Sequence, residues 1–179
     1  MTNPELAILS LIVEKPRHGY EIEQVIEERE MRNWTEIGFS SIYYILNKLE
    51  KEGLISSRTA PAEGRGPARK VYQVTEEGFT HWQAASLETL ANHKIPASPF
   101  QLGLANLPAL PQEAVIEALK SYLEQLLETK QHVMKRREML GNTPPFHVDA
   151  MFEISGRMID AELGWLEEFI HDLEQREES

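Results

Sequence analysis

The stretch from residue 40 to residue 53 constrains the fold of this chain most, because it fits only an amphipathic helix with a defined end. Its apolar side chains recur at steps of three and four, which places them on one side of a helix. Gly53 stands where a helix C-terminus favours a left-handed residue, so we expect the helix to end at Glu52 or Gly53. The opposite side has no carboxylate and can contact DNA. The apolar residues are Ile42, Ile45, Leu46 and Leu49, and the polar ones are Ser40, Tyr44, Asn47, Lys48 and Lys51.

A β-hairpin is predicted directly after this helix. Residues 54–60 and 69–75 are β-branched or alternating segments, and the loop between them consists mostly of Gly, Pro and small residues. Arg65 lies between two glycines in this loop, and Arg69 and Lys70 begin the returning segment, so positive charge gathers at the tip. Thr75 is a suitable N-cap for a further helix. A helix followed by a hairpin with a basic tip indicates a winged helix.

Several short motifs in about the first 80 residues, in this order and at these spacings, resemble the PadR-like family of transcriptional regulators. The resemblance implies a winged helix-turn-helix that binds double-stranded DNA, in a family with members that bind aromatic small molecules between domains. Two features depart from the family's pattern: a wing tip, residues 63–68, that is a little longer, and Tyr44 where many relatives carry proline. The motifs are Arg17-His18-Gly19-Tyr20-Glu21-Ile22, Ser41-Ile42-Tyr43-Tyr44 with Leu46, Leu49-Glu50-Lys51-Glu52-Gly53-Leu54-Ile55, and Arg69-Lys70-Val71-Tyr72 followed by Thr75 and Gly78.

The fold class expected is mainly α with a small β-hairpin, in an N-terminal winged helix-turn-helix and a C-terminal helical dimerisation domain. We expect residues 1–93 to form the DNA-binding domain, with helices from Thr2 or Asn3, from 19 to 30 and from 76 to 93. Residues 94–110 contain three prolines, and Pro111 follows them, but the segment also has apolar residues that need burial, which predicts a packed connecting segment. Residues 111–179 are expected to form a two-helix dimerisation domain.

The two long helices predicted in this last part run from 111 to about 141 and from about 147 to 176. Each carries an apolar stripe that is too wide to be buried against the other helix alone. The simplest partner is the same pair of helices in a second copy, which predicts a two-fold homodimer.

The net charge of −11 argues against a simple nucleic-acid binder, because Lys and Arg contacts to phosphate dominate DNA affinity. The acidity is unevenly distributed, however. Residues 48–75 carry six basic and three acidic side chains, a local balance of +3. We therefore expect weak nonspecific DNA binding at physiological salt and dependence on a specific site engaged by two copies.

The DNA interface is expected to combine phosphate and base contacts. Short hydroxyl and amide groups can read a base edge, whereas lysine and tyrosine heads suit phosphates. In the second helix, only its start, Arg17 to Tyr20, is expected to contact phosphate, because carboxylates follow it. Expected phosphate contacts are Tyr20, Tyr44, Lys48 and Lys70, expected base contacts are Ser40, Ser41 and Asn47, and Arg65 and Arg69 are expected contacts of the wing.

These features predict a homodimeric repressor that binds an inverted repeat, with release by a small hydrophobic or aromatic effector as a further expectation. The alternative is a winged-helix module that binds a protein or a ligand but not DNA, and the acidic balance and longer wing motivate it. A gel shift across salt distinguishes the two. Candidate effector-binding residues are Trp34, Trp82, Phe100, Phe146 and Trp165.

The sequence offers no sign of catalysis or of a cofactor. The six histidines have no metal-ligand spacing, there is no cysteine, and no nucleophile stands with a base in a recognisable pattern. The Gly-x-Gly at 64–66 lacks the ending of a phosphate-binding loop. With neither a signal peptide nor a run of transmembrane length, we expect a cytoplasmic protein without membrane contact.

Overall fold

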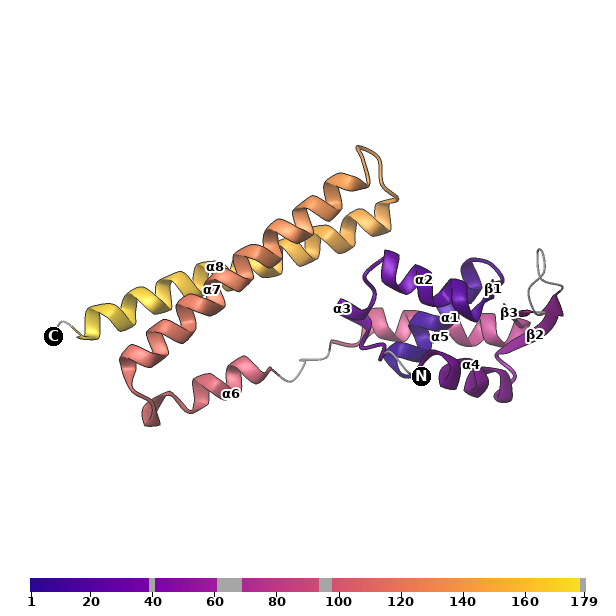
Figure 1. Cartoon of the computed structure of the whole chain (residues 1–179), viewed down its shortest axis with the longest axis horizontal. Coiled ribbons are helices and arrows are strands. Elements are labelled where there is room, and N and C mark those ends of the chain that lie inside the picture. The colour runs from indigo at the N-terminus through magenta and orange to yellow at the C-terminus, as the bar shows by residue number, and fades with distance from the viewer. Residues whose placement is uncertain (39–40, 61–68, 94–97, 178–179) are drawn as a thin grey trace. The chain divides into compact units, whose positions relative to one another are not determined.

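The computed structural model describes residues 1–38, 41–60, 69–93 and 98–177. The chain divides into two compact units, residues 1–95 and residues 96–179. Figure 1 labels the elements of both units along the chain.

The first unit consists of helices around a small antiparallel sheet, which confirms the fold class predicted from the sequence. The strand order is β1-β3-β2. The predicted hairpin is β2 and β3, whereas β1 and the short helix α3 had no counterpart in the prediction. The elements are α1 (Asn3–Glu14), β1 (Arg17–His18), α2 (Gly19–Glu28), α3 (Arg32–Thr35), α4 (Ile42–Lys51), β2 (Ile55–Ala60), β3 (Arg69–Val74) and α5 (Glu76–Ala91).

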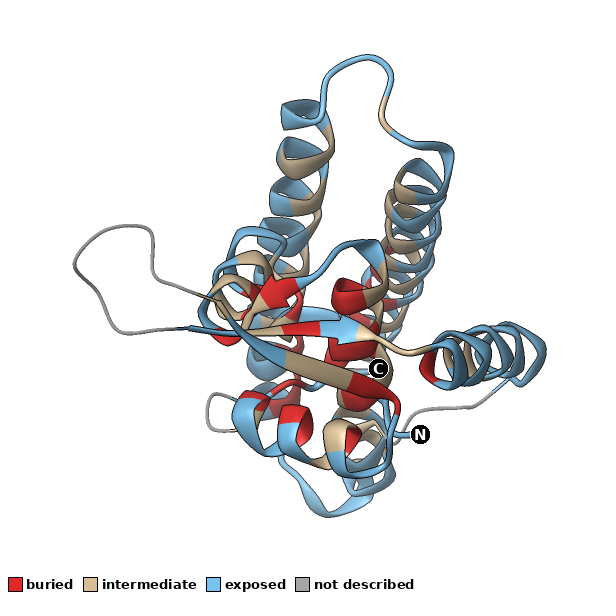
Figure 2. Cartoon of the chain, turned by 90° about the vertical axis from the view of Figure 1, so that its right-hand side faces the viewer, coloured by how far each residue is buried: buried red, intermediate tan, exposed pale blue. Residues whose placement is uncertain are grey.

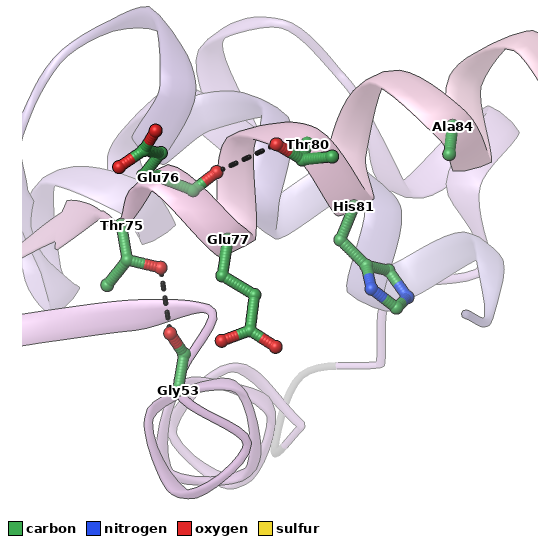
Figure 3. A pocket seen from close by; sticks show the side chains of 7 residues that line it. All are labelled: Gly53, Thr75, Glu76, Glu77, Thr80, His81 and Ala84. Atoms are coloured by element: carbon green, nitrogen blue, oxygen red, sulfur yellow. Dashed lines mark hydrogen bonds between the residues drawn. The ribbon is translucent and has the colours of Figure 1, made fainter.

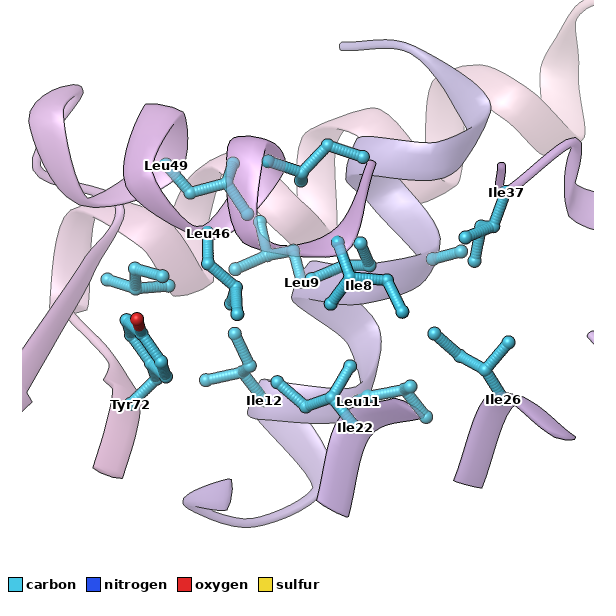
Figure 4. Close-up of a cluster of buried hydrophobic side chains, with 14 of the residues drawn as sticks. Ile8, Leu9, Leu11, Ile12, Ile22, Ile26, Ile37, Leu46, Leu49 and Tyr72 are labelled. Atoms are coloured by element: carbon cyan, nitrogen blue, oxygen red, sulfur yellow. The ribbon is translucent and has the colours of Figure 1, made fainter. Parts of the chain in front are cut away.

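Helix α1 lies at the centre of this unit, in contact with α4, α5 and β3. Its start is fixed by a capping box, in which Thr2 and Glu5 each accept a hydrogen bond from the other's backbone N–H. The apolar side of α4 packs against it, as the spacing predicted. Figure 4 shows the side chains of this core, which include the fully buried Ile8, Leu9, Ile12, Leu46 and Leu49.

The second unit is a helical hairpin preceded by short helical segments. Helices α7 and α8 run antiparallel. Three contacts show this, since they pair early residues of α7 with late residues of α8 and the reverse: Gln112 with Leu173, Lys130 with Asp160 and Arg137 with Asp149. The elements are α6 (Pro99–Ala105), the 3₁₀ helix η1 (Leu107–Ala109), α7 (Gln112–Met139) and α8 (Phe146–Glu177).

The α7–α8 hairpin buries one end of its apolar stripes and leaves much of the rest exposed. A compact cluster around Leu119 and Leu166 is buried. Outside this cluster, large apolar side chains of the two helices are at least two-fifths exposed: Leu127, Met134, Met151, Ile154, Met158 and Trp165. The two stripes are therefore not fully covered by each other.

A hydrogen bond from Tyr122 joins the two long helices. Its hydroxyl donates to Glu162 Oε1 at 2.5 Å. This bond, together with burial and the negative charge of Glu162, raises the pKa of Tyr122 from 10.0 to about 12.

The raised pKa makes the contribution of Tyr122 to stability dependent on pH. A group that the fold stabilises in its protonated form contributes fully below its unfolded pKa of 10.0 and loses that contribution as the pH rises through about 12. We expect the wild-type protein to exceed Tyr122→Phe in free energy of unfolding at neutral pH, and the difference to shrink across this range. Urea denaturation of both proteins at several pH values measures it, and a difference independent of pH contradicts the prediction.

Candidate nucleic-acid interface

Helix α4 presents a polar stripe to solvent. Tyr43 is 56% exposed and Tyr44 71%, and Asn47 and Lys51 are also exposed, whereas the other side of the helix is buried. Ser41 precedes the helix, and its hydroxyl donates to the carbonyl of Gly38 at 2.8 Å. Exposed residues at this spacing form one continuous stripe along a helix.

The first turn of α2 lies against the first turn of α4. A Cβ atom placed on Gly19 would lie 2.8 Å from a ring carbon of Tyr43, so glycine is needed for this close approach. Tyr20, 58% exposed, follows Gly19 directly. The contact therefore brings Tyr20 close to the start of the α4 stripe. Tyr43 was not among the predicted DNA contacts, but its position beside Tyr44 and its exposure add it to the candidate surface.

Lys48 lies at the edge of the stripe and is already paired. Its Nζ donates to Glu5 Oε1 at 2.5 Å, and Glu52 Oε1 lies 3.8 Å away. Burial opposes ionisation of Glu5, but the hydrogen bonds from Lys48 and Thr2 outweigh it and lower the pKa of Glu5 overall. The hydrogen bond to Glu5 raises the pKa of Lys48. That Lys48 contacts phosphate remains a prediction. In this structure Lys48 already has a carboxylate partner.

Lys70 on β3 is also paired. Its Nζ donates to Glu50 Oε2 at 2.6 Å, and the other oxygen of Glu50 accepts from the Ser57 hydroxyl at 2.5 Å. These two bonds join the end of α4 to both strands of the hairpin. They also lower the pKa of Glu50, with the bond from Lys70 as the largest cause.

The register of the hairpin places Arg69 and Lys70 on opposite faces. Thr59 pairs with Lys70, and Ala60 with Arg69, and successive side chains of a strand point to opposite sides. Arg58 is opposite Val71, so it shares the face of Arg69. In Figure 2 the strands accordingly carry both buried and exposed segments. Arg58 and Arg69 are exposed and have no ion-pair partner among the residues that the structure describes.

A junction of hydrogen bonds fixes the hairpin and α5 to the end of α4. Gly53 has a φ of +76°, as expected for the residue that ends this helix. The Thr75 hydroxyl donates to the carbonyl of Gly53 at 2.7 Å, which Figure 3 shows, and accepts from the backbone N–H of Gly78 at 2.9 Å. The surface hollow beside this junction is lined by Glu76, Glu77 and His81 among others. Within the described ranges, no group of three or more histidine or acidic residues is placed to hold a metal ion.

Arg17 is not available to DNA, so the expectation that the segment from Arg17 to Tyr20 contacts phosphate was wrong at its first residue. Only 4% of Arg17 is exposed. Its Nε donates to the carbonyl of Leu11 at 2.8 Å, and a terminal nitrogen donates to Glu14 at 2.6 Å. The guanidinium thus satisfies a carbonyl in the last turn of α1.

We expect Arg17→Ala to lower the free energy of unfolding by about 1 to 3 kcal/mol, because it leaves the carbonyl of Leu11 without this buried partner, whereas Glu14 is partly exposed and keeps Arg29. Arg29→Ala is the control, since Arg29 binds the same carboxylate at the surface. That change should cost less than about 1 kcal/mol. Urea denaturation measures both losses of unfolding free energy. Equal losses for the two variants would contradict the prediction that burial makes Arg17 more important.

The residues predicted to contact DNA differ in their exposure and in their hydrogen-bond partners. Ser40 and Arg65 lie outside the described residues. Tyr20, Tyr44, Asn47 and Arg69 are exposed, Ser41 bonds a backbone carbonyl, and Lys48 and Lys70 are paired with carboxylates.

The candidate effector residues fall in both units. Trp34 is 55% exposed on α3, and Trp82 packs on the first core, where its indole N–H donates to Ser10 at 3.0 Å. In the second unit, the ring centroids of Phe100 and Trp165 lie 6.0 Å apart. Phe146, 86% exposed, lies on α8 roughly 28 Å before Trp165 at the usual helical rise. Phe146 and Trp165 therefore cannot line one small pocket within a single chain.

The aromatic cluster of the second unit borders an apolar groove. Phe100 stacks on Tyr122 at 4.4 Å between centroids, and Trp165 stacks on Phe169 at 4.9 Å. Tyr122 and Phe100 line the groove together with Leu104, Leu107 and Leu119. Its volume, about 260 Å³, lies near the lower end for small-molecule sites.

The fold and this surface define the class as a winged-helix protein, with an exposed polar stripe on the helix that precedes the wing. Residues 8–84 match the model of the transcriptional regulator PadR-like family. None of the helices in the described part of the chain has the length and apolarity needed to cross a membrane.

Similar proteins are known by sequence and by structure. Uncharacterized protein X of Lysinibacillus sphaericus is 38% identical over 71 residues, which cover 40% of this chain and 63% of that protein. The chain thus matches less than two thirds of that relative's length. The crystal structure of Bacillus subtilis PadR in complex with operator DNA has a TM-score of 0.77 and 23% identity, and the match covers 94% of this chain and 98% of that one. Bacillus subtilis PadR in complex with p-coumaric acid has a TM-score of 0.78 and 22% identity, with 96% and 99% covered.

Proposed function

We propose that this chain is a sequence-specific DNA-binding transcriptional regulator of the cytoplasm, which acts as a homodimeric repressor on an inverted repeat. The observation that carries this proposal is the exposed stripe with Tyr44 and Asn47 on a helix whose other side is fully buried. An exposed amide can hydrogen-bond a base edge in the major groove. In a two-fold dimer, two such helices would enter successive major grooves about 34 Å apart. The solved complex of Bacillus subtilis PadR with operator DNA supports this reading through the shared fold.

The dimer is supported by the apolar surface of the second unit. Leu127, Met134, Ile154 and Met158 are 41% to 66% exposed on the two long helices. Exposed apolar surface of this extent is typical of an interaction site, and a second copy offers a surface that matches it. Sedimentation equilibrium at micromolar concentration tests the dimer, and a mass of 20.5 kDa, that of one chain, overturns it.

Release by a small hydrophobic or aromatic effector is part of the same proposal. The groove beside Phe100 and Tyr122 offers an apolar surface in this chain, and Bacillus subtilis PadR has been solved with p-coumaric acid. An effector shifts DNA binding only if its affinity differs between the bound and free conformations. Titration of p-coumaric acid into the protein–DNA complex tests this part, and unchanged DNA affinity up to millimolar concentrations overturns it for this ligand.

The experiment for the main proposal is a fluorescence-anisotropy titration with the DNA upstream of the chain's own coding sequence, set against a random duplex of equal length. We expect preferential binding of the upstream DNA that persists at about 150 mM salt. The carboxylate partners of Lys48 and Lys70 favour the alternative, a winged-helix module that binds a protein or a ligand. Equal binding of both duplexes, or binding of neither, would support that alternative.

A further inference from the structure

The two lysines expected to contact phosphate are held by carboxylates that are themselves fixed. Glu5 is 8% exposed, and its Oε2 accepts from the backbone N–H of Thr2 at 2.9 Å while its Oε1 accepts from Lys48. Glu50 accepts from Ser57 with one oxygen and from Lys70 with the other. Each carboxylate therefore has a second anchor that does not depend on the lysine.

This anchoring determines which group has to move when DNA approaches. A free glutamate side chain could turn away and leave the lysine to a phosphate. Glu5 and Glu50 keep their positions through Thr2 and Ser57, so each lysine has to leave a carboxylate at 2.5 to 2.6 Å before it binds a phosphate fully. The carboxylates also repel the phosphate itself.

Moving each lysine from its carboxylate to a phosphate costs free energy, and this cost affects nonspecific and specific DNA binding unequally. Nonspecific binding depends on charge, through the counterions that Lys and Arg contacts release from phosphates. Base recognition by an uncharged side chain such as that of Asn47 does not require the two lysines to exchange partners. A carboxylate that occupies a lysine therefore weakens nonspecific binding more than specific binding.

We propose that Glu5 and Glu50 are specificity-determining residues of the DNA interface, which compete with DNA phosphates for Lys48 and Lys70. This inference rests on the proposed function. Because Lys48 and Lys70 are held by carboxylates, Arg58 and Arg69 become the first phosphate contacts in the described part of the chain. Both are exposed on one face of the hairpin, and no described residue forms an ion pair with either. The two pairs could instead serve stability alone, and the two roles predict different salt dependence.

The test compares Glu5→Gln and Glu50→Gln with the wild-type protein on a random-sequence duplex over a range of salt concentrations. Glutamine keeps an oxygen that can accept from Thr2 or Ser57, but it lacks the charge that holds the lysine. We expect each variant to bind the random duplex about threefold more tightly at low salt, with a slope of log affinity against log salt that is steeper by about 0.9 for each lysine freed, or about 1.8 for a dimer that carries two. Affinity for the specific site should rise less, so the specificity ratio should fall.

Glu88→Gln is the charge-matched control, because Glu88 lies exposed on α5 and no side-chain ion pair joins it to another described residue. It changes the net charge equally and should leave the slope unchanged. Lys70→Gln in the Glu50→Gln protein should remove the gain, because the freed cation is then absent. Thermal unfolding checks that each variant is folded, and if Glu50→Gln is not, Glu5→Gln tests the inference alone.

An unchanged slope in folded Glu5→Gln and Glu50→Gln, or an equal rise in Glu88→Gln, overturns the inference. The random duplex separates this result from a failure of the proposed function. A wild-type protein that does not prefer the upstream DNA refutes sequence-specific regulation, whereas the competition of the two carboxylates with phosphate is still decided by the salt slopes.

Discussion

Gly78→Ala should unfold the winged helix at temperatures where the wild-type protein is stable. A Cβ atom at this position would lie 1.8 Å from the carbonyl oxygen of Leu54. That oxygen is backbone, and it accepts hydrogen bonds from the N–H and the hydroxyl of Thr75 at 3.1 Å each. The clash cannot be relieved by a side-chain rotation and has to displace α5 from the start of the hairpin.

The expected cost is at or above the upper end of ordinary overpacking, about 3 kcal/mol or more. For a unit of this size, that corresponds to a fall in Tm on the order of 12 to 24 °C. Calorimetry of the full chain measures it. Gly38→Ala is the matched control in the same unit, because its Cβ would meet only Ser41 Oγ at an ordinary 3.7 Å. Similar Tm values for the two variants would contradict the prediction.

Loss of the exposed stripe of α4 should abolish most of the preference for specific DNA without harm to the fold. Tyr44 is 71% exposed and Asn47 is exposed, and neither belongs to the core. A good base contact contributes about 1 to 3 kcal/mol of discrimination. We expect Tyr44→Ala with Asn47→Ala to weaken binding of the upstream DNA about 100-fold or more, and binding of a random duplex by much less, because only the phosphate contact of Tyr44 is lost there.

Gln83→Ala, an exposed polar residue of α5, is the control for the loss of side chains at the surface. It should bind both duplexes as the wild-type protein does. The Tm of the double variant should stay within about 2 °C of the wild type, because surface changes away from special features cost little. Intact specific binding by the double variant would remove the main support for the proposed interface.

The sequence predicted those elements of the winged helix whose pattern of apolar, glycine and proline residues lies within the element or next to it. The spacing of Ile42, Ile45 and Leu49 predicted α4, and Gly53 predicted its end. The alternating segments on either side of a Gly- and Pro-rich loop predicted β2 and β3. The two-residue strand β1 was not predicted, because its only support is pairing of Arg17 with Tyr72 and His18 with Val71 across more than fifty residues.

The electrostatics of the interface could not be predicted for the same reason. Glu5 and Lys48 are 43 residues apart, and only the packing of α1 on α4 brings them together. A composition count treats Lys48 and Lys70 as free positive charges, although each has a carboxylate partner. Burial of Arg17 likewise depends on a long-range contact, because β1 pairs Arg17 with Tyr72 of β3.

The contact between Gly19 and Tyr43 has one signal in the sequence itself. Glycine lacks a Cβ and so permits close approach to the backbone, and Gly19 begins α2 beneath the Tyr43 ring. The sequence places Gly19 and Tyr43 in two of the motifs that resemble the family. Their contact sets how the first turns of α2 and α4 meet, which is a feature of the interface and not only of the core.

The central position of α1 also has a consequence for synthesis on the ribosome. This helix emerges first, but the elements that cover it, α4, β3 and α5, end only at Ala91. At a synthesis rate of about 5 to 20 residues per second, the apolar surface of α1 stays uncovered for on the order of 4 to 15 seconds. The nascent chain is therefore most exposed to aggregation and to chaperone binding before α5 has left the exit tunnel.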